Sequence, residues 1–378
     1  EMTKRKIQIL LFLKWLLSLL KKFKNYFYSG KFMSENELVI YGDEGEGGGQ
    51  VLRTSLTLSA ITGKPFQLLR IRGKRPNPGL QKQHLTCVIS TAQMCSAQVT
   101  GDQLKSSEIR FVPGKILGGD FQYDLQGAGS TMLVAQTVLP ILAFAPKPSS
   151  VTLLGGTHND MAPPFDFVVQ TLFPWTKKMG FGFELDLERY GFYPRGGGKI
   201  VARIQPYTGQ GKLIQILDRG KFLKLQARIL SAHQSATLIE EETKELSRKF
   251  QIDPSQIRIE TISNTGGPGN VLSVEALYEN GSQMFTSFCP KEGSPREWVH
   301  SILSEYHHIQ KTSALVEEYL SDQLLLYMAL KRGGCFFTTN PLSLHTTTNI
   351  TIIERFLPVK FSTETTEQGT LIKLEPKE

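Results

Sequence analysis

The sequence has little cysteine, and its cysteines form no familiar pattern. No two stand in a C-x-x-C pair, and none has histidine partners at the spacing of a zinc site. Neither a structural zinc ion nor a disulfide framework is therefore indicated. A reducing compartment is the simplest setting for free thiols, so we expect a cytoplasmic protein. The four residues are Cys87, Cys95, Cys289 and Cys335.

Two common nucleotide-binding signatures are also missing. No G-x-x-x-x-G-K-[ST] sequence occurs, and G-x-G-x-x-G fails in the most glycine-rich loop because Gln50 stands where the third glycine is needed. Both a P-loop ATPase and a Rossmann dehydrogenase are thereby disfavoured. A nucleotide site in this protein must use another arrangement.

Long hydrophobic runs are scarce. Residues 7–20 are apolar except for Gln8, Lys14 and Ser18, which makes the run short for a membrane span. Lysines follow it in place of a small-residue cleavage site, which argues against a secretory signal. We expect no stable membrane partner and interpret residues 1–32 as a basic, apolar extension outside the working protein. A basic helix lying on a membrane surface is the alternative.

Positive charge is concentrated at one end of the chain. The net charge is +8, and residues 1–32 hold eight lysines and arginines against Glu1 alone. The remaining chain is close to neutral, so overall basicity does not argue for a nucleic-acid partner. Contacts with RNA would have to rest on local clusters such as Arg70, Arg72, Lys74 and Arg75.

The hydrophobic pattern predicts an α+β fold. With 378 residues, 40% of them hydrophobic, the chain can form one large domain and one small one. Short β-branched runs alternate with helical stretches from residue 37 on, which is typical of sheets covered by helices. Expected strands lie near 37–42, 65–72, 108–112, 119–125, 150–155, 182–188 and 198–205, and expected helices near 48–61, 79–98, 129–144 and 164–179.

The pattern changes between residues 208 and 308, where we expect a small inserted α+β domain. Its expected strands lie near 213–217, 222–230, 256–263 and 270–278, and its helices near 233–249 and 294–308. Residues 33–207 and 309–378 would then form the large domain. A helix over 313–330 and the segment 334–374 complete a third repeat of the α+β unit.

The most informative loop is residues 45–53, GEGGGQVLR, between an expected strand and an expected helix. Glycines allow the backbone to approach a ligand closely, and a helix N-terminus offers unpaired N–H groups to phosphate. A triphosphate would fit this loop. The alternative is an ordinary tight turn from strand to helix.

Seven blocks, taken together in this order and spacing, resemble the RNA 3′-terminal phosphate cyclases. The resemblance covers roughly residues 38–374. The blocks are GEGGGQVLR at 45–53, PGLQKQHLT at 78–86, GAGSTMLVAQTVLP at 127–140, GGTHNDMAPP at 155–164, GFYPRGGG at 191–198, EYLSDQL at 318–324 and HTTTNI at 345–350.

The resemblance implies an ATP-dependent enzyme that converts the 3′-phosphate end of RNA into a 2′,3′-cyclic phosphodiester. A histidine first takes AMP from ATP, the RNA phosphate then takes AMP from the histidine, and the neighbouring 2′-hydroxyl finally expels AMP. The implied partner is RNA with a 3′-phosphate end. The oligomeric state is left open between a monomer and a homodimer.

The resemblance also assigns residues. His345 corresponds to the adenylylated histidine, and Glu46 to a carboxylate that contacts Mg²⁺ or Mn²⁺. The implied ATP-binding positions are Gln136, Tyr319, Leu320, Ser321, Asp322 and Gln323. The implied contacts with RNA phosphates or pyrophosphate are Arg53, Arg72, Arg75, Gln83 and His84.

Some details qualify these assignments. On a helix, Tyr319, Asp322 and Gln323 share one face by their spacing, whereas Leu320 and Ser321 do not. Tyr41 and His158 stand where relatives commonly have Asp. The first alternative is a non-catalytic, cyclase-like protein of ribosome assembly, which would lack the histidine. The second is a transferase of similar architecture, such as an enolpyruvyl transferase.

Overall fold

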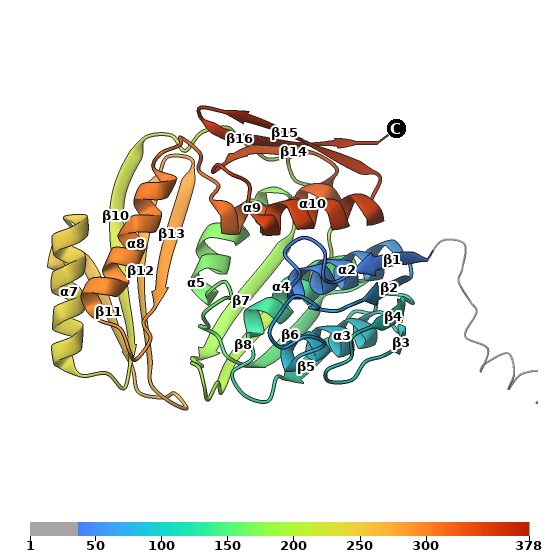
Figure 1. Ribbon diagram of the computed structural model, residues 1–378, viewed down its shortest axis with the longest axis horizontal. Coiled ribbons are helices and arrows are strands. Elements are labelled where there is room, and N and C mark those ends of the chain that lie inside the picture. Colours follow the sequence, from blue (N-terminus) through green and yellow to red (C-terminus); the bar gives the residue numbers. More distant parts are fainter. Residues whose placement is uncertain (1–36, 378) are drawn as a thin grey trace, which may run out of the picture. The chain divides into compact units, whose positions relative to one another are not determined.

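A computed structural model describes residues 37–377, and the extension expected at residues 1–32 lies outside the described residues. The residues from Leu38 on form one compact unit with an α+β fold of mixed sheets and helices (Figure 1). In this described part no helix has both the length and the apolar character needed to cross a membrane.

Three sheets in the described residues share one strand order. In each, the first two strands in chain order are parallel, the fourth pairs antiparallel with the second, and the third pairs antiparallel with the fourth. The first sheet contains β1 (Leu38–Tyr41), β2 (Phe66–Leu69), β3 (Gln98–Thr100) and β4 (Ile109–Val112). The second contains β5 (Asp120–Asp124), β6 (Ser149–Gly155), β7 (Gly182–Arg189) and β8 (Gly198–Gln205). The third contains β9 (Gln215–Ile216), β14 (Gly334–Thr338), β15 (Val359–Thr366) and β16 (Gly369–Pro376).

A fourth sheet has a different order, β11-β10-β12-β13. Two amphipathic helices, α7 (Ala236–Phe250) and α8 (Pro295–Ile309), pack against each other and against this sheet (Figure 1). A short turn of helix, η2 (Pro254–Gln256), precedes β11. The strands are β10 (Phe222–Ala232), β11 (Ile257–Ile262), β12 (Gly269–Tyr278) and β13 (Gly281–Phe288).

The helices that accompany the other three sheets pack together. The central one, α2, contacts three of the others, and its Leu52 and Leu56 are fully buried. Burial of such leucines contributes roughly 1.5–3 kcal/mol each. The helices are α2 (Gly49–Thr62), α3 (Lys82–Met94), α4 (Thr131–Ala143), α9 (Glu318–Lys331) and α10 (Leu344–Phe356). A further helical stretch consists of α5 (Phe165–Phe167), the wider turn η1 (Val168–Leu172) and α6 (Phe173–Lys178).

The structure differs from the expected elements in a few places. The strand expected near 213–217 is β9, and it pairs in parallel with β14 instead of joining the fourth sheet. The fourth sheet therefore begins at β10. The helix expected over 313–330 begins only at Glu318, because the Glu317 side chain accepts hydrogen bonds from Tyr319 N and Leu320 N and caps it there.

Two strands were not expected at all. Helix α3 ends at Met94, earlier than residue 98, and the chain then forms β3. Strand β13 pairs with β12 through a hairpin whose last register pair is Tyr278 and Gly281. The two turn residues are Glu279 and Asn280, and Gly281 already belongs to β13.

Candidate active site

The glycine-rich loop between β1 and α2 lies directly against the start of α10. Gly45 has a φ of +58°, and a side chain there would collide with the hydroxyl of Thr348. The next backbone N–H, that of Glu46, donates to Thr348 Oγ1 at 2.9 Å. Glycine at position 45 therefore lets the loop approach α10, although the two segments are about 300 residues apart in the chain.

His345 occupies the first turn of α10, next to this loop. Ser343 caps the helix by accepting from Thr346 N at 3.2 Å, which fixes the turn that carries His345. The ring atom Nδ1 lies 2.8 Å from Gln50 Oε1. The other ring nitrogen, Nε2, lies 3.8 Å from Glu46 Oε1.

A chain of hydrogen bonds fixes the hydrogen on the His345 ring. Gln50 Nε2 donates to Asp322 Oδ2 at 2.9 Å, so Gln50 presents its oxygen, an acceptor, to the histidine. His345 Nδ1 must then carry the hydrogen, and Nε2 carries a lone pair. Asn349 donates to the backbone oxygen of Asp322 at 2.6 Å and holds α9 against α10.

The electrostatic surroundings keep the imidazole neutral. Burial, together with the positive charges of Arg53 and Arg75, lowers the pKa of His345 below its ordinary value of 6.5. Burial raises the pKa of Asp322 to about 7, although Arg53 opposes that rise. A neutral imidazole with a lone pair at Nε2 is the form that can act as a nucleophile.

Glu46 offers the carboxylate nearest to His345. Its Oε2 accepts from Gly48 N at 2.7 Å, and its Oε1 pairs with Arg75. Among residues 37–377 no three His, Cys, Asp or Glu side chains gather closely enough to hold a metal ion. A divalent ion held by this one carboxylate would take most of its ligands from substrate phosphates and water.

A cavity of about 500 Å³ opens beside His345. Six of the residues assigned from the resemblance line it, namely Arg53, Gln136, Tyr319, Asp322, Gln323 and His345. The three- and four-residue spacing correctly places Tyr319, Asp322 and Gln323 on the cavity face of α9. Leu320 and Ser321 are fully buried and do not line the cavity, so the implied contact of these two side chains with the nucleotide is not supported.

Amide and guanidinium groups converge on this cavity. Gln136 Nε2 donates to Gln323 Oε1 at 2.5 Å, and Gln323 Nε2 donates to Tyr319 O at 2.9 Å. Arg53 makes no side-chain hydrogen bond to any other residue between 37 and 377. Its guanidinium can therefore bind an anion that enters the cavity.

Comparison with known proteins assigns this chain to a family. The family "RTC: RNA 3′-terminal phosphate cyclase" matches residues 44–363. An RNA 3′-terminal phosphate cyclase from Koribacter versatilis is 41% identical, covering 91% of this chain and 96% of the relative. The chain belongs to the RNA 3′-terminal phosphate cyclase family.

Two further cyclases show the same extent of similarity. The protein of this description from Ralstonia nicotianae is 41% identical, and the match covers 88% of this chain and 95% of the relative. The one from Salmonella enteritidis is 40% identical, and the match covers 89% of this chain and 98% of the relative. Among solved structures, the enolpyruvyl transferase NikO from Streptomyces tendae matches with a TM-score of 0.25 and 10% identity. The match covers 45% of this chain and 33% of that one, and a score this low supports no conclusion about the fold. The cyclase family is a family of enzymes, and its members use ATP.

The remaining positions assigned from the cyclase resemblance lie outside the cavity. His84 is buried at the start of α3, and its Nε2 faces Gly49, where any side chain would collide with it. Burial and the charges of Arg53 and Arg72 lower the pKa of His84 to about 3, so it stays neutral. Gln83 accepts from Ser130 N at 3.2 Å and thereby joins the starts of α3 and α4.

Two arginines of this group already have partners. Arg72 donates to the backbone oxygens of Asn77 and Gly79 and holds its own loop. Arg75 pairs with Glu46. The structure thus brings Glu46, Arg75, Gln83 and His84 to the region around α2. Arg72 instead stabilises the loop in which it lies through its hydrogen bonds to Asn77 and Gly79.

Several residues of the site were not foreseen from the cyclase motifs. Gln50 and Asn349 stand inside recognised blocks, but only the fold shows that they orient His345 and Asp322. The cavity is also lined by residues 160–164 and by side chains from the fourth sheet. These are Met284, Thr286 and Phe288 of β13, together with Glu305 of α8.

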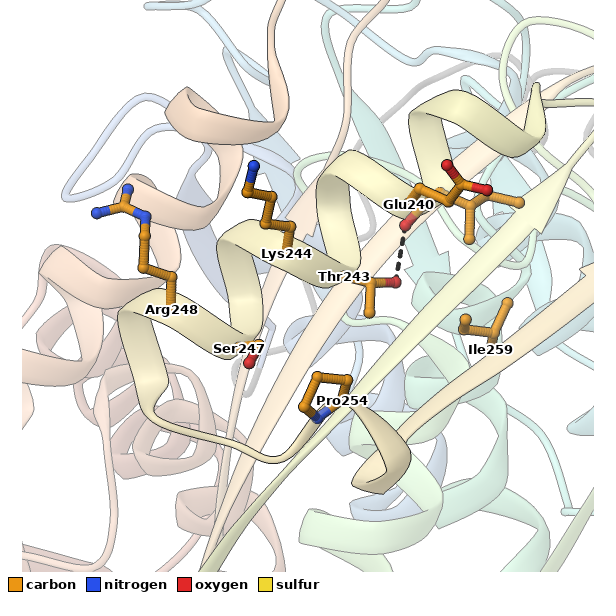
Figure 2. Close-up of a pocket in the computed structure, with 8 residues that line it drawn as sticks. Glu240, Thr243, Lys244, Ser247, Arg248, Pro254 and Ile259 are labelled. Atoms are coloured by element: carbon orange, nitrogen blue, oxygen red, sulfur yellow. Dashed lines mark hydrogen bonds between the residues drawn. The ribbon is translucent and has the colours of Figure 1, made fainter.

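A second cavity, of about 560 Å³, lies along α7 near β11 (Figure 2). It contains none of the positions assigned from the cyclase family. Thr243 there donates to the backbone oxygen of Ile239 at 2.7 Å within the helix. Its lining residues are Ile239, Glu240, Thr243, Lys244, Ser247, Arg248, Pro254 and Ile259.

Proposed function

We propose that this protein uses ATP to convert the 3′-phosphate end of RNA into a 2′,3′-cyclic phosphodiester, with release of AMP and pyrophosphate. The family names support this activity. The observation that carries the proposal is His345, whose Nε2 lone pair stands free of the Gln50 hydrogen bond at the edge of a nucleotide-sized cavity.

ATP would bind in this cavity. The amides of Gln136 and Gln323 and the guanidinium of Arg53 provide donors for phosphate and ribose oxygens. Pro163, Pro164 and Phe288 provide apolar surface for the base.

In the first step His345 Nε2 would attack the α-phosphorus of ATP. A nitrogen–phosphorus bond forms, and the bond from that phosphorus to the pyrophosphate oxygen breaks. Gln50 would hold the ring in the reacting orientation throughout, because its oxygen accepts the Nδ1 hydrogen. As the ring gains positive charge, that hydrogen bond strengthens and stabilises it.

In the second step an oxygen of the RNA 3′-phosphate would attack the AMP phosphorus, and the nitrogen–phosphorus bond breaks. The product is RNA carrying a 3′-linked pyrophosphate bridge to adenosine. In the third step the 2′-hydroxyl would attack the RNA phosphorus, the bond from that phosphorus to AMP would break, and the hydroxyl proton would pass to solvent. A phosphate monoester lacks a good leaving group, and coupling to AMP supplies one.

Glu46 would hold a Mg²⁺ or Mn²⁺ ion together with the substrate phosphates, and that ion would neutralise charge on the departing pyrophosphate. Arg75, now paired with Glu46, would turn to a phosphate when the ion binds. Arg72, Gln83 and His84 are proposed contacts for RNA phosphates. Arg72 and Gln83 would have to exchange their present protein partners for phosphate, and His84, now buried, would have to become accessible.

We further propose that the three sheets of equal strand order are repeats of one unit. The shared order of their parallel and antiparallel pairs supports this. The fourth sheet, with α7 and α8, would be a small domain inserted into the third repeat, because it lies between β9 and β14 in the chain.

Incubation with α-labelled ATP and Mg²⁺ or Mn²⁺ tests the proposed function. We expect label to become covalently attached to the protein and to be discharged by RNA with a 3′-phosphate end, which becomes cyclic. RNA ending in a 3′-hydroxyl should not discharge the label. Absence of label in the presence of ATP and metal would favour the non-catalytic, cyclase-like alternative.

A further inference from the structure

A cluster of charged and aromatic side chains connects the loop after β6 to the fourth sheet. Asp166 of α5 is its centre. Arg228 Nη1, from β10, lies 2.7 Å from Asp166 Oδ2, and His158 Nε2 lies 3.2 Å from the same oxygen. His158 Nδ1 in turn lies 2.9 Å from the hydroxyl of Thr157. None of these groups has a part in the reaction proposed above.

The other side of Arg228 is also occupied. Its Nη2 donates to Glu260 Oε2 at 2.8 Å and to the hydroxyl of Tyr190 at 2.9 Å. That hydroxyl donates to Glu260 Oε1 at 2.6 Å. One guanidinium from β10 therefore joins α5, the end of β7 and β11, which are distant in the chain.

The cluster is largely shielded from water. The side chains of Arg228 and Asp166 are only 15% and 19% exposed, and that of His158 is fully buried. Burial alone would raise the pKa of Asp166, but His158 and Arg228 more than offset that effect and lower it. Asp166 therefore stays ionised, and loss of Arg228 would leave this shielded carboxylate with His158 alone as a partner among the described residues. Glu260 would keep its contacts with Arg258 and Tyr190.

Apolar packing accompanies these ionic contacts. Phe192, Leu230 and Val271 belong to a second, smaller core cluster, and Tyr190 packs against it. The ring of His158 lies 5.4 Å from that of Tyr190 and 5.8 Å from that of Phe192, measured between centroids. Phe288, which lines the large cavity, packs against the same small cluster.

The cluster lies at both ends of a segment of chain that lines the large cavity. Residues 160–164, which line the cavity, lie between His158 and Asp166 in the chain, so the ionic contacts hold both ends of that segment. Asn159 Nδ2 adds a hydrogen bond to Ala128 O at 2.6 Å. The segment 160–164 has few other polar ties among the described residues, and Met161 is 84% exposed.

We propose that Arg228 and Asp166 are positioning residues for nucleotide binding. Their ion pair holds residues 160–164 and Phe288 at a fixed separation from the helices that carry His345 and Gln323, and so sets the width of the cavity. The inference rests on the proposed function, because it takes the nucleotide to be the occupant of that cavity.

The test uses the full chain with Arg228→Met, Arg228→Lys and Asp166→Asn. Initial rates of covalent labelling from α-labelled ATP, without RNA, give the KM for ATP and the rate at saturating ATP. We expect Arg228→Met and Asp166→Asn to raise the KM about tenfold or more and to change the saturating rate by less than about twofold. Arg228→Lys should bind ATP more tightly than Arg228→Met but less tightly than the wild type. Lysine keeps the positive charge but cannot contact Asp166 and Glu260 at the same time, as arginine does.

Two matched controls separate positioning from stability. Arg203→Met removes an exposed ion pair with Asp186 on β8 and β7, and it should leave the KM unchanged. Val274→Ala creates a cavity in the core of the fourth sheet and should lower the Tm. Val274 pairs with Ala227, the neighbour of Arg228, so its side chain points to the opposite face of the sheet from that of Arg228. The Tm of every variant, measured by thermal unfolding, shows how far each substitution destabilises the protein. If Arg228→Met does not fold, Asp166→Asn still tests the positioning role.

The outcomes are distinct. If Arg228→Lys and Asp166→Asn fold and keep the wild-type KM, the positioning role is overturned. The positioning role is also overturned if Val274→Ala lowers the Tm as much as Arg228→Met does and raises the KM for ATP by the same factor. If the wild-type protein takes no label at all, the proposed function itself fails, and that result is recognisable before any variant is compared.

Discussion

Two walls of the large cavity differ in how their side chains are held. The histidine wall, consisting of Gln50, Asp322, Gln323, His345 and Asn349, comes from α2, α9 and α10. The loop wall consists of residues 160–164 with Met284, Thr286 and Phe288 of β13. Direct hydrogen bonds link Gln50, Asp322, His345 and Asn349 of the histidine wall, whereas the loop wall is held from outside by Arg228 and Asp166.

This difference connects the histidine wall with the rate of reaction and the loop wall with the affinity for ATP. A nucleophile must be held within a fraction of an ångström, and short hydrogen bonds between helices can do that. A base-binding wall needs only shape and apolar surface, which packing can supply. Changes to Gln50, Asp322, His345 or Asn349 should therefore lower the rate of reaction, and changes in the loop wall should weaken binding.

The largest expected effect is that of His345→Asn. Asparagine has a similar size and polarity but cannot form the bond to AMP. We expect covalent labelling to fall by about 10⁴-fold or more, with ATP binding largely retained. Single-turnover labelling and equilibrium binding of ATP measure the two properties separately.

His84→Asn is the matched control, because His84 is the other histidine close to the glycine-rich loop. It should still take label in the absence of RNA. Wild-type labelling in His345→Asn, together with its loss in His84→Asn, would move the nucleophile to His84. RNA already carrying the 3′-linked AMP should still cyclise with His345→Asn, since that step no longer needs the nucleophile.

Gln50→Leu should have the next largest effect. It removes the acceptor that holds the Nδ1 hydrogen of His345 and also the donor to Asp322. Loss of a hydrogen bond to a buried group costs roughly 1–3 kcal/mol, so we expect labelling at saturating ATP to slow about 10- to 100-fold. The KM for ATP should change little. A raised KM with an unchanged saturating rate would show that Gln50 binds ATP instead of orienting the histidine.

The role of Gln50 illustrates what the sequence could not show. The block GEGGGQVLR predicted a loop that binds phosphate at a helix start, and the loop is there. The sequence separation of 295 residues between Gln50 and His345 hides their contact, because it depends on how α2 and α10 pack. Local motifs thus identified the region of the site, but not which side chains orient one another.

The loop wall was even less accessible to sequence reasoning. The block GGTHNDMAPP was recognised without a role for most of its residues. Strand β13 was missed, and with it the contribution of Phe288 to the cavity. The pairing of β9 with β14 was also hidden, since a two-residue strand carries no periodic signal.

The pH dependence of labelling should distinguish two groups of the histidine wall. The lowered pKa of His345 keeps it neutral to below pH 6.5, and its reactivity is lost only when it gains a proton below that value. Asp322, with a pKa of about 7, becomes neutral earlier and then weakens its hydrogen bond with Gln50. We expect a shallow decline of the rate near pH 7 and a steep loss below pH 6.5.

Asp322→Asn sharpens that prediction, because it removes the group responsible for the shallow decline. The variant should show a single acid limb below pH 6.5, measured by single-turnover labelling at saturating ATP. An acid limb centred above pH 6.5 in this variant would contradict the lowered pKa of His345.

The smallest expected effect lies at the tip of the loop wall, with Met161→Ala. Met161 is 84% exposed, so truncation should change the free energy of unfolding by no more than about 0.5 kcal/mol. Because Met161 contributes to the cavity lining, the KM for ATP should rise slightly, by about twofold. The saturating rate of labelling should stay the same, because the contacts of His345 with Gln50 are untouched. A marked fall in that rate would mean that the two walls are coupled, and the division between chemistry and affinity would not hold.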